Sequence, residues 1–295
     1  MLALVYLAHC AAVVLGGAFL VWLISLLMRD ASIIDIFWGF GFALVGATCL
    51  WLAHQPGGYP LTPYQWLMGL MPVLWGLRLT AYLARRNLGH GEDPRYVAMR
   101  KRSGMGEMAW RVRALFTIYF GQGLLILIVS APVWVAVATA EARYRELGFP
   151  TPGINGGPGQ SVGVEIGVLA LTGAALWLAG VLFEAIGDMQ LRRFMKTMRG
   201  YDGPYADKPV LDTGLWAWTR HPNYFGNALL WWGIFIAACQ APWGWLSFPG
   251  PLIMTLLLVK VSGRDLLERQ MMKRHAYRDY AERTSSFLPM PPKRS

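Results

Sequence analysis

The sequence predicts an all-α polytopic membrane protein in which residues 1–295 form one domain of about seven transmembrane helices. Of the 295 residues, 55% are hydrophobic and only 15% are charged, whereas soluble proteins carry roughly 25% charged residues. Runs of about 20 mostly apolar residues recur along the chain, and each can cross a hydrocarbon core of about 30 Å. The fourteen tryptophans agree with this class, because indole rings favour the membrane–water boundary.

Seven apolar runs mark the expected spans, and the charges between them predict their orientation. The runs cover residues 3–28, 32–53, 63–84, 114–139, 162–187, 223–240 and 245–262. Cytoplasmic loops of membrane proteins carry an excess of Lys and Arg. With the N-terminus outside and the C-terminus inside, only Arg143 and Arg145 of the 27 basic residues fall in an outer loop. We therefore expect an N-out, C-in topology.

Several other classes of site are not supported by the residue pattern. The formal charge of +10 is not accompanied by a nucleic-acid motif, so we expect no nucleic-acid partner. Cys10, Cys49 and Cys239 each lie alone in an apolar run, which predicts buried thiols and no metal site. Gly39 and Gly41 follow no strand, so close helix packing explains them better than a dinucleotide loop does.

The longest predicted inner loop, residues 85–113, has two interpretations. It holds eight basic residues against Glu92, Asp93 and Glu107. Such a loop can anchor the topology by lying along anionic headgroups. The same cations can instead take part in binding a phosphate-rich ligand. The sequence leaves both alternatives open.

The first of three polar segments leaves the expected fifth span. Glu184, Asp188 and Arg192 are four residues apart, so they share one stripe of a helix. An ion pair at a helix end would account for this spacing. Alternatively, the carboxylates accept ribose hydroxyls while the basic residues that follow hold phosphates; these include Arg193, Lys196 and Arg199.

The second polar segment crowds Arg220, His221, Asn223 and Tyr224 directly before the sixth span. Pro222 suits the first turn of a helix, where its missing N–H is harmless. The helix N-terminus beside Arg220 is then a natural phosphate site. An aromatic membrane interface with an arginine anchor is the simpler interpretation, but it requires neither the histidine nor the asparagines.

The third segment is the C-terminal tail, which begins at Gly263 and includes Arg264, Glu268 and Arg269. Taken alone, it predicts an amphipathic basic helix that binds a membrane surface.

These segments together resemble the steroid 5α-reductase C-terminal family, in its bacterial branch of uncharacterised multi-pass proteins. The resemblance rests on FEAIGDMQLRRF, VLDTGLWAWTRHPNYFGN and LLERQM followed by YRDYAERTSSFLP, and it covers roughly residues 165–290. In that family the corresponding segments wrap NADPH on the cytoplasmic side of a seven-helix bundle. The resemblance therefore implies an NADPH-dependent oxidoreductase acting on a carbon–carbon double bond.

Carried over by position, the resemblance implies a set of cofactor-binding residues. They are Glu184, Asp188, Arg192, Arg193, Lys196, Lys208, Arg220, His221, Asn223, Tyr224, Arg264, Glu268 and Arg269. Two positions depart from the family, which often has Asn in place of Glu184 and Glu in place of Asn227. Residues 141–295 would form the cofactor half and residues 1–140 the substrate cavity.

The substrate half is matched more loosely. The steroid reductases polarise an enone carbonyl with a Glu on the second span and a Tyr on the third. Asp35 lies close to the place of that Glu, and Trp75 stands where the Tyr is expected. The nearest phenol is Tyr82, so the resemblance implies Asp35 and Tyr82 as catalytic candidates, with Asp35 stabilising the enolate.

The resulting hypothesis is a membrane-embedded NADPH-dependent reductase in the bacterial inner membrane, with its cofactor site facing the cytoplasm. Its substrate would be an apolar, steroid- or lipid-like molecule that enters from the bilayer. The alternative is an S-adenosylmethionine-dependent methyltransferase resembling the isoprenylcysteine carboxyl methyltransferases, which share an RHPxY-like block. The dense basic residues at 192–220 favour the phosphorylated cofactor. A non-catalytic lipid carrier would need no polar cofactor cleft.

Overall fold

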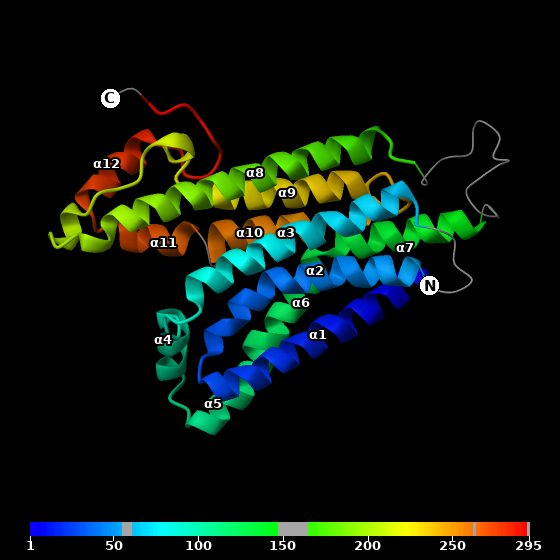
Figure 1. The fold of residues 1–295 in the computed structure, drawn as a ribbon, viewed down its shortest axis with the longest axis horizontal. Helices are drawn as coiled ribbons and strands as arrows, with labels where there is room; N and C mark the ends of the chain where they lie inside the picture. Colours follow the sequence, from blue (N-terminus) through cyan, green and yellow to red (C-terminus); the bar gives the residue numbers. More distant parts are fainter. Residues whose placement is uncertain (55–60, 147–164, 262–263, 294–295) are drawn as a thin grey trace. The chain divides into compact units, whose positions relative to one another are not determined.

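Helix is the only regular secondary structure in the part of the chain that the computed structural model describes, residues 1–54, 61–146, 165–261 and 264–293. These residues divide into two compact units. The first comprises Met1–Leu171 with Ile234–Gly250, and the second comprises Thr172–Gly233 with Pro251–Ser295. Figure 1 labels the helices of both.

The helices of the first unit follow one another through most of the N-terminal half. They are α1 (Leu2–Met28), η1 (Ala31–Ile33), α2 (Ile34–Ala53), α3 (Pro63–Asn87), α4 (Pro94–Ser103), α5 (Glu107–Ala114), the π-helical η2 (Leu115–Tyr119), α6 (Phe120–Val129), α7 (Ala131–Glu146) and η6 (Gly244–Ser247).

The remaining helices lie wholly or mostly in the second unit. They are α8 (Val168–Thr197), η3 (Met198–Gly200), η4 (Tyr205–Asp207), η5 (Gly214–Ala217), α9 (Pro222–Ala238), α10 (Pro249–Leu256), the π-helical η7 (Leu257–Val261), α11 (Arg264–Met271) and α12 (His275–Arg283).

Five helical segments of the described chain are long and apolar enough to cross a membrane, which makes the chain an integral membrane protein. They are Leu2–Met28, Ala31–Ala53, Pro63–Asn87, Glu107–Val129 and Val168–Gly200. Shorter apolar helices cover Ala131–Ala142 and Gly244–Lys260. The expected all-helical membrane class is therefore confirmed, whereas the count of seven spans and their orientation stay predictions.

The expected fourth span, residues 114–139, is wrong as one continuous helix. Helix α6 ends at Val129, and α7 begins at Ala131, directly before Pro132. Ser130 marks the junction: its N–H donates to Ile126 O (2.9 Å), and its carbonyl accepts from Val133 N (2.9 Å). Proline has no N–H to continue the helical ladder, so a new helix starts next to Pro132.

Glycines allow α2 and α3 to pack backbone against backbone within the first unit (Figure 1). A Cβ on Gly39 would lie 2.7 Å from Gly76 O, and one on Gly76 would lie 2.4 Å from Gly39 O. Seven residues further along α2, a Cβ on Gly46 would lie 2.4 Å from Gly69 O. Small residues at such crossings are typical of membrane helices, so the packing role predicted for Gly39 is confirmed.

Close backbone packing at glycines also holds α8 against α9 in the second unit. A Cβ on Gly226 would lie 2.5 Å from Glu184 N, and one on Gly180 would lie 2.5 Å from Leu230 N. Helix α9 begins at Pro222, as the sequence predicts. Close packing therefore brings the polar start of α9 against the carboxylates of α8.

Candidate functional site

Two buried carboxylates on α8 form the centre of the candidate site. Glu184 is 3% exposed and Asp188 is 4% exposed. The side-chain amide of Asn223, from the first turn of α9, donates to Asp188 Oδ1 at 3.2 Å. Gly187 permits the close approach of α9 to α8, because a Cβ there would lie 3.2 Å from Asn223 N. Glu184, Asp188 and Asn223, all expected to bind the cofactor, are thus brought together.

Asn227 extends this cluster by one turn along α9. Its side chain is 8% exposed, and its Oδ1 has no hydrogen-bond partner among the described residues. A buried acceptor without a donor is costly, at about 1–3 kcal/mol, and calls for an explanation. A polar ligand that donates a hydrogen bond to this oxygen would supply one.

Arg220 and Glu268 form a buried bidentate ion pair beside the cluster. Arg220 Nε and Nη2 donate to the two carboxylate oxygens of Glu268, both at 2.9 Å. Arg220 Nη1 donates to Ala281 O and Thr284 O, each at 2.8 Å. The side chains of Arg220 and Glu268 are only 9% and 14% exposed. Arg220, expected to hold a phosphate, therefore fastens the C-terminal tail.

His221 completes this arrangement. Its Nε2 lies 3.0 Å from Glu268 Oε1, and its ring stacks on Tyr224 with centroids 5.3 Å apart. Burial alone would raise the pKa of Glu268, but hydrogen bonds from His221 and Arg220 lower that pKa to about 2. Glu268 is thus held as a carboxylate that accepts hydrogen bonds from both neighbours.

The tail is also held to residues 208–219, directly before the RHPNYFG segment, by contacts that sequence reasoning missed. Thr219 Oγ1 donates to Phe287 O (2.9 Å), and Tyr280 OH donates to Trp216 O (2.5 Å). Arg274 Nη2 donates to the carbonyl of Lys208 at 2.5 Å. Burial raises the pKa of the Tyr280 phenol above its usual range. Backbone acceptors carry no side-chain signal, so nothing in the sequence marks these donors.

Apart from the Lys208 carbonyl, which accepts from Arg274, the remaining basic residues of the expected cofactor set differ in where they lie and in their exposure. Arg192, Arg193 and Lys196 are exposed on the last turns of α8, and Arg269 is exposed on α11. Lys208 is half-buried next to η4. The side chain of Arg264 lies outside the described part of the chain. The second unit therefore combines buried carboxylates with exposed cations on one helix, α8.

A second polar cluster lies in the first unit, around Asp35 at the start of α2. Tyr96 OH donates to Asp35 Oδ1 at 2.5 Å, and Arg95 Nη2 donates to Asp35 Oδ2 at 2.7 Å. Gln122 Nε2 donates to Tyr96 OH at 3.2 Å. Burial and the neighbouring Asp35 charge raise the pKa of Tyr96. Tyr82, the expected partner of Asp35, instead has its ring near the guanidinium of Arg78, 6.0 Å from the ring centroid.

The helices and these clusters define a polytopic membrane protein with polar sites at helix ends. Its residues 21–284 match a family described as a protein of unknown function, DUF1295, and the chain belongs to that family. The family is related to steroid 5α-reductase-like proteins, so the expected resemblance is confirmed at this coarser level.

An uncharacterized protein of Schizosaccharomyces pombe, C594.04c, is similar to the chain. The two are 22% identical over 290 residues, which cover 91% of this chain and 75% of the relative. No solved structure matches the chain.

Proposed function

We propose that this protein is a membrane-embedded NADPH-dependent reductase of a carbon–carbon double bond in an apolar substrate. One observation carries the proposal: α8 presents two buried carboxylates and, one to three turns later, three exposed cations. Carboxylates suit ribose hydroxyls, and arginine and lysine suit phosphates, including a 2′-phosphate. The family relationship supports the same assignment.

The residues present fit this cofactor. Asp188 is already positioned by Asn223, and Asn227 Oδ1 is a buried acceptor without a donor among the described residues. Arg192, Arg193 and Lys196 would hold the phosphates, while Glu184, Asp188 and Asn223 would hold the sugar hydroxyls. NADPH, when bound, supplies the hydride. Arg220, His221 and Glu268 would act indirectly, because their described contacts fasten the tail against α9.

For the substrate half, Asp35 remains the candidate from the sequence, and its contacts favour Tyr96 over Tyr82 as the neighbouring acid. Asp35 accepts two hydrogen bonds, so it is placed as an acceptor rather than as a donor. Tyr96 is the hydroxyl donor of the pair, and Gln122 orients its oxygen. The Tyr96 hydroxyl would exchange its hydrogen bond to Asp35 for one to the enolate oxygen that develops during reduction.

The proposal includes the topology that the sequence predicts. Seven spans, N-out and C-in, would put α4, α5, residues 188–222 and the tail from Gly263 on the cytoplasmic side, where NADPH is available. The apolar substrate would then enter from the bilayer. Labelling of a cysteine introduced at position 279 from outside intact cells would contradict this orientation.

Calorimetry on the detergent-solubilised chain tests the cofactor. We expect NADPH to bind more tightly than NADH, and S-adenosylmethionine not to bind. Asp188→Ala and Asn223→Ala should each weaken NADPH binding by about tenfold or more, because each removes a partner for a buried polar group. Asp212→Ala is the matched control, since Asp212 forms an ion pair with Arg283 in which both side chains are more than a third exposed.

The outcomes separate the candidate functions. Tight binding of S-adenosylmethionine alone would replace the reductase with the methyltransferase. Binding of none of the three cofactors would favour a lipid carrier. If Asp188→Ala and Asn223→Ala bind NADPH like Asp212→Ala, the cofactor lies elsewhere.

A further inference from the structure

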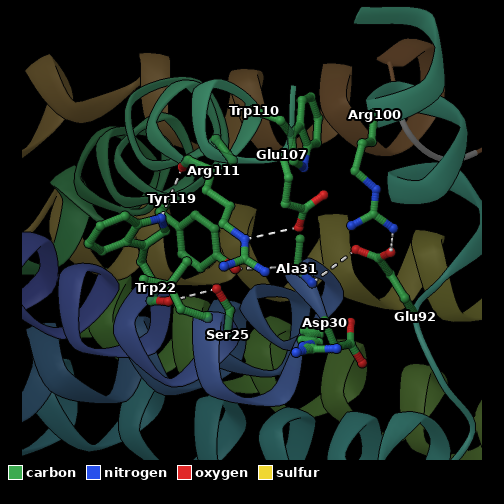
Figure 2. Close-up of a pocket in the computed structure, with 13 residues that line it drawn as sticks. Trp22, Ser25, Asp30, Ala31, Glu92, Arg100, Glu107, Trp110, Arg111 and Tyr119 are labelled. Carbon is green, nitrogen blue, oxygen red and sulfur yellow. Dashed lines mark hydrogen bonds and ion pairs between the residues drawn. The ribbon is translucent and has the colours of Figure 1, made fainter. Parts of the chain in front are cut away.

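A polar pocket lies in the first unit, where α1 ends and both η1 and α5 begin. It is a half-open depression, and the empty space between its lining residues is about 320 Å³ when open solvent is included. Figure 2 shows Trp22 and Tyr119 next to the Arg111–Glu107 ion pair, and the Arg100–Glu92 ion pair at the opposite side of the pocket. Three candidate spans start or stop here, at Met28, Ala31 and Glu107, so we expect the pocket to lie near the membrane boundary. None of its lining residues belongs to the proposed NADPH or substrate sites.

The charges that line the pocket balance. Arg100 Nη2 pairs with Glu92 Oε2 at 2.5 Å, and Arg111 Nε pairs with Glu107 Oε1 at 2.9 Å. Arg29 and Asp30 add one charge of each sign. Three guanidinium groups face three carboxylates, so the pocket favours a ligand that itself carries both signs over a simple anion.

Arg29 is the cation left over from these pairs. It is exposed, and it makes no ion pair within the described part of the chain. Its backbone lies in the left-handed region, with φ 55° and ψ 36°, where glycine is favoured. An arginine at this helix end costs of order 1 kcal/mol relative to glycine, so packing does not explain its presence. A ligand that contacts the Arg29 guanidinium would explain why arginine occupies this position.

The surroundings of the pocket indicate a lipid. Trp22 Nε1 donates to Arg111 O at 3.0 Å, and Trp110 is 5% exposed, so two indoles build the wall at the depth that they prefer in membranes. Leu27 and Met108 are the sequence neighbours of the lining residues Leu26 and Glu107, and they are 85% and 71% exposed. Acyl chains would cover these side chains while a headgroup occupies the pocket.

We propose that this pocket binds the headgroup of an ethanolamine phospholipid. The phosphodiester lies beside Arg29, and the primary ammonium lies beside Asp30 and the oxygen of Glu107 that does not pair with Arg111. An ammonium with three N–H donors satisfies carboxylates, whereas a quaternary choline has none and a glycerol headgroup has no cation. The site is independent of the proposed reductase, and binding alone tests it.

The first experiment measures lipid selectivity on the full chain in detergent. Dioleoyl phosphatidylethanolamine, phosphatidylcholine and phosphatidylglycerol are titrated separately, and bound lipid is counted by native mass spectrometry. We expect the ethanolamine lipid to bind about tenfold or more tightly than the other two. Inorganic phosphate and glycerophosphoethanolamine, which lack acyl chains, should bind at least tenfold more weakly. Equal affinity for the three lipids, or saturation by inorganic phosphate at the same concentration, would overturn the proposal.

The second experiment assigns the binding to the pocket. Arg29→Gly removes the guanidinium and also relieves the left-handed backbone, so this variant should unfold at the parent's temperature or above. We expect it to lose about tenfold or more in affinity for the ethanolamine lipid. Arg102→Ala removes a charge from the exposed face of α4, outside the pocket, and should bind like the parent. Equal lipid affinity of the two variants would overturn the assignment.

Discussion

Replacing Arg220 with glutamine should release the C-terminal tail from the second unit. The substitution removes a bidentate ion pair to Glu268 and two hydrogen bonds to the carbonyls of Ala281 and Thr284. Removing one partner of a buried ion pair costs about 3–5 kcal/mol. Hydrogen bonds from His221 and Arg220 together lower the pKa of Glu268 to about 2, so Arg220 supplies only part of that shift. We therefore expect Arg220→Gln to lose about 3 kcal/mol, at the low end of the range for a buried ion pair.

Denaturant unfolding in detergent, with limited proteolysis of the tail, measures this loss. The matched control is Arg283→Gln, which breaks an ion pair to Asp212 whose side chains are 46% and 38% exposed. Exposed pairs contribute about 0–1 kcal/mol, so this control should stay close to the parent. If Arg220→Gln is no less stable than Arg283→Gln, or if its tail resists protease as in the parent, Arg220 does not hold the tail and the reasoning is refuted.

Three further predictions concern acid stability, helix packing and the cluster at Asp35. Because folding lowers the pKa of Glu268, its stabilisation is complete above pH 4.5 and is lost as the pH falls through about 2; an acid titration followed by proteolysis should show this loss in the parent and not in Glu268→Gln. Gly226→Ala places a Cβ 2.5 Å from Glu184 N and should destabilise the fold by about 1–3 kcal/mol in thermal unfolding, whereas Gly16→Ala, with no atom within 4 Å of its Cβ, should not. Tyr96→Phe should keep NADPH affinity by calorimetry and lose turnover of an enone; unchanged turnover would exclude Tyr96 as the acid.

The sequence predicted the helices best where an apolar run has clear ends. The first three expected spans coincide with α1, α2 and α3 to within a few residues, and Pro222 begins α9 as expected. The fourth expected span was drawn as one run because hydropathy is continuous across Ser130, where the helix stops and restarts before Pro132. Composition records how apolar a run is, and it does not record whether one helix or two traverse it.

Parts of the candidate site were predictable because they depend on helical spacing. Glu184 and Asp188 are one turn apart, so the carboxylate pair is visible in the sequence. Tyr96 was missed because it is 61 residues from Asp35, and only the fold brings them together. Arg220 could be recognised as important, but its acceptors are backbone carbonyls of the tail, which no residue pattern identifies.

Backbone contact between α2 and α3 also bears on the order in which the chain assembles. Nine residues, 54–62, join the two helices, and the seam between them consists of Gly39 against Gly76 and Gly46 against Gly69. Contacts so close in sequence cost little chain entropy to form, and glycines leave no side chains to rearrange. We expect this hairpin to dock as soon as both helices have left the insertion machinery, and to serve as the template against which later helices of its unit are placed.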